Sequence, residues 1–220
     1  MNGKHSHGRW RVAPRLAGIA LALLGAGPAH AVLHAEHALR YTGWMGWTPV
    51  TVEVTLRERP GNLYEYREWE APRWWAAVLG GPEARQTMMR VAGSDFRPVS
   101  YEAPDGTLSP LDDLEADVFD PLGVRLEARA DLAAGRREAA YRVWQPDGSI
   151  ETWRLEVTGD EVVETPDARY RALTFRLGND AHWIRGWSAP LVVFHFVKLE
   201  FWEADKRVGL LELEVKELYE

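Results

Sequence analysis

Tryptophan is the residue type in this chain whose number and spacing most suggest a binding site. The chain has 11 tryptophans, and ten of them follow residue 31. An indole ring is a large, rigid apolar surface with one hydrogen-bond donor, so clustered rings can line an apolar cavity, stack on sugar rings or fill a core. We predict that three close pairs line or gate a ligand site: Trp44 and Trp47, Trp74 and Trp75, and Trp183 and Trp187.

The adjacent pair Trp74 and Trp75 is the hardest of the three to place in a core. Neighbouring residues of a strand point to opposite faces, and neighbouring residues of a helix do not share one direction either. We therefore expect this pair at the mouth of a cavity or at an interface with another molecule.

Residue types that bind metals are present, but their spacing does not favour a metal site. His34 and His37 are three residues apart, as helical zinc ligands can be, yet here the chain is expected to be frayed or to enter its first strand. His195 is a lone histidine that we expect to be packed or to face solvent. The acidic stretch from Leu108 to Asp117 lacks the ordered Asp, Asn and Gly pattern of a calcium loop. The sequence predicts neither a metal nor another cofactor.

Catalytic groups in recognisable arrangements are missing as well. The chain has no cysteine, and no serine after residue 31 lies in a Gly-x-Ser-x-Gly turn. No glycine-rich loop opens a helix as a phosphate site requires. Close carboxylate pairs are expected by chance among 33 acidic residues, so they do not by themselves indicate a glycosidase. We predict that the protein has no catalytic residues and is not an enzyme.

The first 31 residues have the features of a secretory signal peptide. Four basic residues precede an apolar run from Leu16 to Gly27, and Pro28-Ala29-His30-Ala31 supplies small residues for cleavage. The run is shorter than the ~20 residues of a membrane-spanning helix. We expect cleavage near Ala31 and a periplasmic or secreted mature protein with no integral membrane segment.

The mature chain is acidic and has the length of one domain. Residues 32–220 include 22 basic and 33 acidic residues, a formal charge of −11. Nucleic-acid binding needs clustered lysine and arginine, so no nucleic-acid partner is expected. A chain of this length buries about 70% of its unfolded surface in one core. We assign residues 32–220 to a single β-rich domain.

Alternation of apolar and polar residues from Leu39 onward predicts a mainly β, antiparallel fold. The turn sequences Arg59-Pro60-Gly61-Asn62 and Gln145-Pro146-Asp147-Gly148 each predict a hairpin. In the final strand, Leu211, Leu213 and Val215 are expected to share one face. The predicted strands cover 52–56, 63–69, 138–144, 149–157, 169–177, 191–202 and 208–218.

One or two short helices are expected between the strands. Asp120 is suited to cap a helix, Pro121 to its first position, and Gly135 to its end. A second short helix is expected from Pro72 to Leu79, where the alternation breaks before Gly80-Gly81-Pro82.

Short motifs in a fixed order resemble those of a family of exported bacterial proteins that is known only as a domain of unknown function. The motifs are Phe96-Arg97-Pro98-Val99-Ser100-Tyr101-Glu102, Asp117-Val118-Phe119-Asp120-Pro121-Leu122, Glu164-Thr165-Pro166 and Trp187-Ser188-Ala189-Pro190. The resemblance implies a single antiparallel sheet curled into a barrel or half-barrel, similar to periplasmic carriers that hold acyl chains inside a curved sheet. It implies no catalytic residues.

Three functions follow as hypotheses. Export, a curled sheet and unassigned tryptophans favour a periplasmic, non-catalytic binding or carrier module for a lipid or other hydrophobic envelope component. The first alternative is a structural or assembly protein of the cell envelope that docks on a protein partner through an aromatic patch around Arg73 to Leu79. The second alternative is a glycan-binding module in which paired tryptophans stack on sugar rings.

Overall fold

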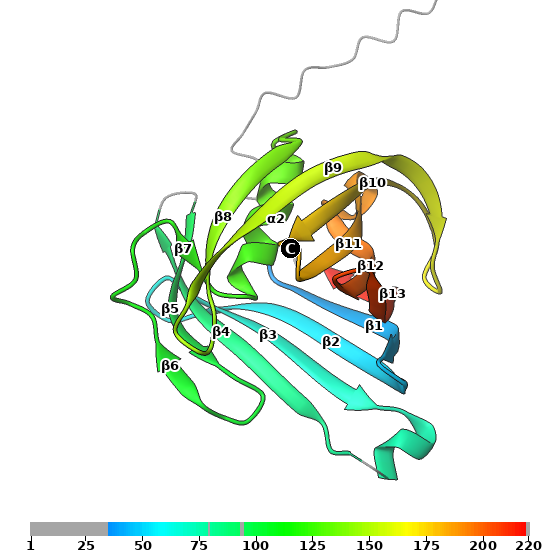
Figure 1. Ribbon diagram of the computed structural model, residues 1–220, viewed down its shortest axis with the longest axis horizontal. Helices are drawn as coiled ribbons and strands as arrows, with labels where there is room; N and C mark the ends of the chain where they lie inside the picture. The colour runs from blue at the N-terminus through cyan, green and yellow to red at the C-terminus, as the bar shows by residue number, and fades with distance from the viewer. Residues whose placement is uncertain (1–34, 79, 93–94, 219–220) are drawn as a thin grey trace, which may run out of the picture.

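The computed structural model describes residues 35–78, 80–92 and 95–218, which form one curled β-sheet around a helix (Figure 1). The predicted signal peptide and His34 lie outside the described residues. No described helix has the length and apolar character needed to cross a membrane. The strands are β1 (His37–Met45), β2 (Thr48–Arg59), β3 (Leu63–Pro72), β4 (Glu83–Ala92), β5 (Asp95–Glu102), β6 (Leu108–Pro110), β7 (Val118–Phe119), β8 (Glu138–Trp144), β9 (Ile150–Glu164), β10 (Arg169–Gly178), β11 (His182–Ala189), β12 (His195–Glu203) and β13 (Lys206–Leu218).

The strands form a single sheet in the order β6-β5-β4-β3-β2-β1-β13-β12-β11-β10-β9-β8-β7. Neighbours are antiparallel except β7, which pairs with β8 in parallel. Figure 1 shows the sheet curling around the helix, so that β7 at one edge comes back close to β5 near the other. Among the described residues no ladder joins the edge strands β6 and β7. The predicted curled antiparallel sheet is confirmed, as a barrel that is not fully closed.

Both predicted hairpins form where their turn sequences place them. Arg59 pairs with Leu63 across the β2–β3 turn, in which Gly61 and Asn62 have positive φ angles of 85° and 57°. In the β8–β9 turn the Gln145 N–H donates to the Ser149 carbonyl at 2.8 Å. Turn chemistry therefore set the register of these strands locally.

Two details of the strands differ from the prediction. The strand expected from residue 191 begins only at His195, because the short 3-10 helix η2 (Pro190–Val192) and the left-handed residues Val193 and Phe194 come first. Val215 does not share a face with Leu213, because the pairing of β13 with β1 has a bulge at this point. A bulge shifts the alternation by one residue, and Val215 is exposed.

The principal helix is α2 (Gly123–Ala133), which begins two residues after Pro121, the predicted first position, and has Leu122 at its N-cap. Asp120 still holds the turn that leads into it. The Asp120 carboxylate accepts hydrogen bonds from the backbone N–H of Leu122 at 2.8 Å and of Gly123 at 3.0 Å. Gly135 follows the helix with a φ of 80°, as a C-terminal glycine should. The second predicted helix is present as the 3-10 helix η1 (Trp74–Val78).

Helix α2 occupies the interior of the curled sheet and is buried on nearly every side. Leu122 and Leu126 pack in the main hydrophobic cluster with inward-facing residues of the sheet, such as Val52, Leu177 and Leu213. The same helix also buries two arginines and an aspartate. Its burial therefore combines apolar packing with a polar network inside the curl.

Candidate functional site

The six predicted tryptophans lie on the outer face of the sheet and in loops at one end of it. Trp44 lies in β1, and Trp183 and Trp187 lie in β11. Trp47 lies in the β1–β2 turn, while Trp74 and Trp75 begin η1 in the β3–β4 connection. The three sequence pairs do not converge on a single site, and the partner of Trp183 is a tryptophan that the prediction omitted.

Trp44 and Trp183 belong to a row of side chains that we call the aromatic ladder. The Trp183 ring stacks on Trp202 with centroids 4.9 Å apart and planes 7° apart. The Arg176 guanidinium lies 4.6 Å from the centroid of Trp183, and the Arg207 guanidinium lies 5.2 Å from that of Trp44. Trp202 pairs with Arg207 across β12 and β13. The row therefore crosses five neighbouring strands, β10, β11, β12, β13 and β1, with the members Arg176, Trp183, Trp202, Arg207 and Trp44. Its cation–π and stacking contacts stabilise the outer face.

The aromatic ladder predicts that Trp183 supports stability. Trp183→Ala removes one stacked pair and one cation–π contact, and we expect it to lower the free energy of unfolding by about 2 kcal/mol. Trp47→Ala is the matched control, because Trp47 is 94% exposed; its expected effect is within about 0.5 kcal/mol. Urea denaturation at neutral pH measures both. Equal effects of the two substitutions would contradict this assignment.

Trp187 is held by charged side chains of the outer face. Its indole N–H donates to the Glu161 carboxylate at 2.7 Å. The Arg185 guanidinium and the Lys198 ammonium lie 4.8 Å and 5.5 Å from its ring centroid. Only 4% of Trp187 is exposed, so this ring is a structural element and offers no open face to a sugar.

The remaining three tryptophans form, with Val78, a surface that we call the tryptophan tip. Trp47, Trp74, Trp75 and Val78 are 94%, 71%, 57% and 86% exposed. The Arg73 N–H donates to the Pro49 carbonyl at 2.7 Å, which ties the start of η1 to β2 just beyond Trp47. The tryptophan tip therefore brings large apolar side chains from two adjacent connections to one end of the sheet.

Trp74 is also held in an uncommon backbone conformation. Its φ angle is 51°, in the left-handed region, which costs a non-glycine residue of order 1 kcal/mol and is usual only where the surroundings impose it. The Arg73 guanidinium lies 4.8 Å from the Trp74 ring centroid. The ring is therefore presented to solvent in an imposed orientation, which is typical of a binding surface.

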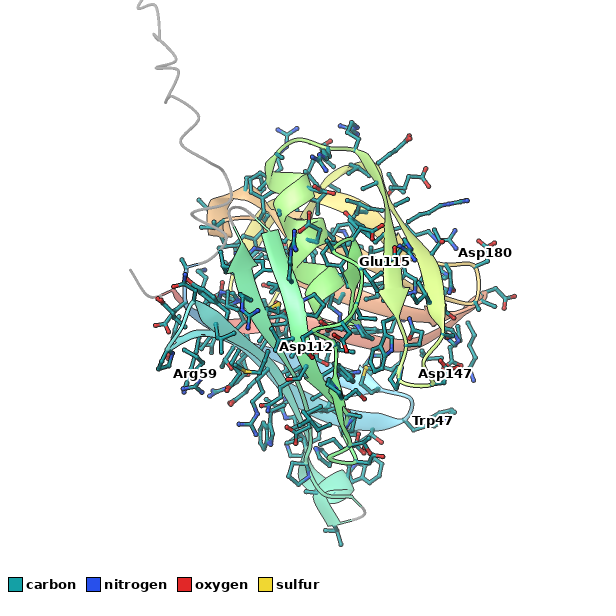
Figure 2. All side chains as sticks on the ribbon, turned by 90° about the vertical axis from the view of Figure 1, so that its left-hand side faces the viewer. Trp47, Arg59, Asp112, Glu115, Asp147 and Asp180 are labelled. Atoms are coloured by element: carbon teal, nitrogen blue, oxygen red, sulfur yellow. The ribbon has the colours of Figure 1, made fainter. Side chains whose placement is uncertain are left out.

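Exposed acidic side chains lie in the other connections at the same end of the sheet. Asp105, Asp147, Asp180 and Asp205 are exposed in the β5–β6, β8–β9, β10–β11 and β12–β13 connections. Figure 2 shows Trp47, Asp147 and Asp180 along one side of the molecule, with Arg59 on the opposite side. The apolar tip thus lies within a negatively charged end.

Inside the curl, a buried ion-pair cluster connects α2 to the sheet. The Glu68 carboxylate of β3 forms ion pairs with Arg125 of α2 and Arg85 of β4. Burial alone raises the pKa of Glu68, but the charges and hydrogen bonds of the two arginines outweigh it and lower that pKa to about 2. Glu68 is therefore ionised at any physiological pH and holds α2 by charge.

Two buried histidines lie next to this cluster. The rings of His37 and His195 meet edge to face with centroids 4.3 Å apart, and Arg129 donates to His195 Nδ1 at 3.0 Å. Burial, with the charge of Arg129, lowers the pKa of His37 to about 3 and that of His195 well below its usual value. Both rings are neutral at pH 7. Within the described part of the chain, no group of three or more His, Asp or Glu side chains could hold a metal.

A cleft lies near the two edges of the curled sheet, which no ladder joins within the described residues. It has a volume of about 680 Å³, and its apolar lining comes from Phe96 of β5, Phe119 of β7 and Tyr141 of β8. The rings of Phe119 and Tyr141 meet edge to face at 6.0 Å. Its acidic lining includes two residues of α2, Glu127 and Asp131. We call this the seam cleft.

Sequence reasoning missed both the buried cluster and the seam cleft. One signal for the first was available, because Arg125 and Arg129 are one helical turn apart in the helix that also carries Leu126, Ala130 and Ala133, and arginine is rarely buried without a partner. The seam cleft gave no signal, since its lining residues come from four separate segments.

Three solved structures resemble this fold at low sequence identity. A β-barrel-like protein of the domain of unknown function DUF1849 from Brucella abortus has a TM-score of 0.47 and 7% identity, covering 84% of this chain and 98% of that one. A Bacteroides fragilis protein described as exported, with a YmcC-like fold, has a TM-score of 0.36 and 13% identity, covering 83% and 95%. A Parabacteroides distasonis protein described as a lipoprotein has a TM-score of 0.36 and 10% identity, covering 83% and 95%.

No protein-family model matches the chain, and no curated protein matches it significantly.

Proposed function

We propose that this protein is a non-catalytic module of the cell envelope that docks on a protein partner through the tryptophan tip. The observation that supports this most directly is the exposure of Trp47, Trp74 and Trp75, at 94%, 71% and 57%. Exposed aromatic side chains gathered at one place are characteristic of protein interfaces, where tryptophan is enriched among the residues that dominate binding energy.

The charge around the tryptophan tip favours a protein over a lipid surface. The four loop aspartates of this end would be repelled by anionic lipid headgroups, whereas a partner with an apolar patch and a basic rim complements both features. The mature chain as a whole is also acidic, at a formal −11. Docking at the periplasmic face of an envelope protein fits the export that the signal peptide predicts.

The lipid-carrier hypothesis requires space for an acyl chain inside the sheet. Helix α2 and the core side chains occupy that interior, and of the six predicted tryptophans only Trp187 belongs to the core cluster. Lipid carriage therefore stays a prediction that receives less support than docking. The glycan hypothesis also receives less support than docking. The rings of Trp183 and Trp187 are already in contact with other side chains of the protein, which leaves less of them for a sugar.

Photo-crosslinking tests the docking proposal directly. A photoreactive residue at position 75 or 47, in protein expressed with its signal peptide, is expected to give one discrete protein adduct in the periplasm. The matched control is position 162, because Val162 is exposed on β9 and is not part of the tryptophan tip. We also expect Trp75→Ala to remove the adduct formed from position 47.

Two outcomes would contradict the proposal. The first is the same adduct pattern from positions 75 and 162, and the second is a lipid bound to the purified protein in place of a protein partner. Native mass spectrometry with solvent extraction, on protein purified without detergent, detects such a lipid and would support the carrier hypothesis instead.

A further inference from the structure

Among the described residues, strand β8 lacks a neighbouring strand along most of one side. On one side it pairs with β9 along its whole length, from Glu138 to Trp144. On the other side β7 pairs with Arg142 and Val143 alone. Within the described parts of the chain, no strand therefore pairs with residues 138–141 on that side.

The direction of the backbone groups follows from the ladder with β9. The N–H of Val157 in β9 donates a hydrogen bond to the Arg137 carbonyl at 2.8 Å, so the backbone groups of Arg137 point toward β9. Backbone groups of successive strand residues alternate between the two sides, so those of Glu138 and Ala140 point toward the open side. Both residues are exposed. They offer two N–H donors and two carbonyl acceptors for a further strand.

The seam cleft adjoins this open edge and carries an excess of negative charge. Its lining includes four carboxylates, from Asp117, Glu127, Asp131 and Glu138, against the guanidinium groups of Arg136 and Arg142. Arg136 is already paired with Asp131 at 2.9 Å, and Arg142 with Asp117 at 3.1 Å. Positive charge in an incoming segment would complement this lining.

We propose that the open edge of β8 accepts an extended segment of a protein partner, in which basic side chains alternate with apolar ones. The segment adds a strand beside residues 138–141, in line with the two-residue strand β7. Its apolar side chains contact Phe119 and Tyr141, and its basic side chains, which point to the opposite face, lie on the side of Glu138. This is recognition by strand addition, in which main-chain hydrogen bonds give affinity and alternate side chains give specificity.

The site is separate from the tryptophan tip and goes beyond the proposed function. The β8–β9 turn lies at the end of the sheet that carries the tip, whereas residues 138–141 lie toward the opposite end of β8. A compact apolar ligand would use the aromatic lining but would leave the backbone groups of Glu138 and Ala140 without partners. An extended peptide uses both, which is why the open edge favours it.

A designed peptide tests the proposal. The probe is acetylated and amidated Lys-Val-Lys-Val-Lys-Val, with Glu-Val-Glu-Val-Glu-Val as the charge-reversed control, and the dissociation constant is measured by fluorescence anisotropy on the mature protein. We expect the lysine peptide to bind and the glutamate peptide not to bind. Ala140→Pro removes one donor from the edge and should weaken binding by about tenfold or more. Ala140→Thr keeps the donor and should change it by less than about twofold.

Hydrogen exchange gives a readout that does not depend on the folding of a variant. In the wild-type protein, the amides of Glu138 and Ala140 should exchange more slowly when the lysine peptide is bound. Three results would overturn the proposal: no binding of the lysine peptide, equal weakening by Ala140→Pro and Ala140→Thr, or binding without protection of these two amides. A negative crosslinking result at the tryptophan tip would not contradict this proposal, because the two surfaces are tested with different variants.

Discussion

Glu68→Gln is expected to lower the free energy of unfolding by about 3–5 kcal/mol, the cost of leaving a buried charge without its partner. Glu68 is 4% exposed and Arg125 is 8% exposed, so water cannot replace the lost carboxylate around that guanidinium. Because α2 fills the interior of the sheet, loss of this anchor affects the whole core. Urea denaturation followed by tryptophan fluorescence measures the change.

The control for Glu68 is an ion pair at the surface. Asp160→Asn breaks the pair with Arg171, whose side chain is 79% exposed, and its expected effect is below about 1 kcal/mol. Adding Arg125→Met to Glu68→Gln removes the more buried of the two guanidinium groups left without Glu68, so the double variant should be more stable than Glu68→Gln alone. If Glu68→Gln and Asp160→Asn have equal effects, the buried cluster does not anchor the helix.

The second large effect is a loss of stability in mild acid. His37 has a pKa of about 3 in the folded protein and about 6.5 when unfolded, and the folded pKa of His195 is also depressed. The neutral rings therefore stabilise the fold above pH 6.5, and this contribution is lost progressively as the pH falls toward 3. At pH 5.0 we expect a loss of about 2 kcal/mol from His37 relative to pH 7.5, and a further loss of the same sign from His195.

The histidines and the buried ion-pair cluster lose their contributions to stability over different pH ranges. The pKa of Glu68 falls from 4.5 to about 2 on folding, so its contribution is lost only below pH 4.5. Urea denaturation at pH 7.5 and 5.0 therefore measures the histidine effect. His195→Gln should weaken the dependence of the free energy of unfolding on pH, while His182→Gln, at an exposed position, should leave that dependence in place. An unchanged free energy of unfolding between the two pH values would show that the rings are not buried in neutral form.

Local sequence signals accounted for much of the fold. The two turn sequences predicted both hairpins, and Asp120 with Gly135 bounded the helix, because turn and cap preferences depend on a few neighbouring residues. Alternation predicted the antiparallel sheet. It failed at Val215, where a bulge against β1 shifts the alternation, and at residues 191–194, where two left-handed residues precede β12. Both departures arise from pairing or backbone geometry that composition does not encode locally.

The candidate sites depended much more on the tertiary structure. The sequence by itself determined that tryptophan is abundant, that it comes in pairs, and that the exposed pair at positions 74 and 75 breaks the strand pattern. Only the fold decided that Trp183 stacks on Trp202 and that Trp47 lies at the same end as η1, because both depend on how the strands pair. The same holds for Glu68 with Arg125 and for the seam cleft. Side-chain type and spacing are local properties, whereas burial, partner and open edge exist only once the sheet has curled around the helix.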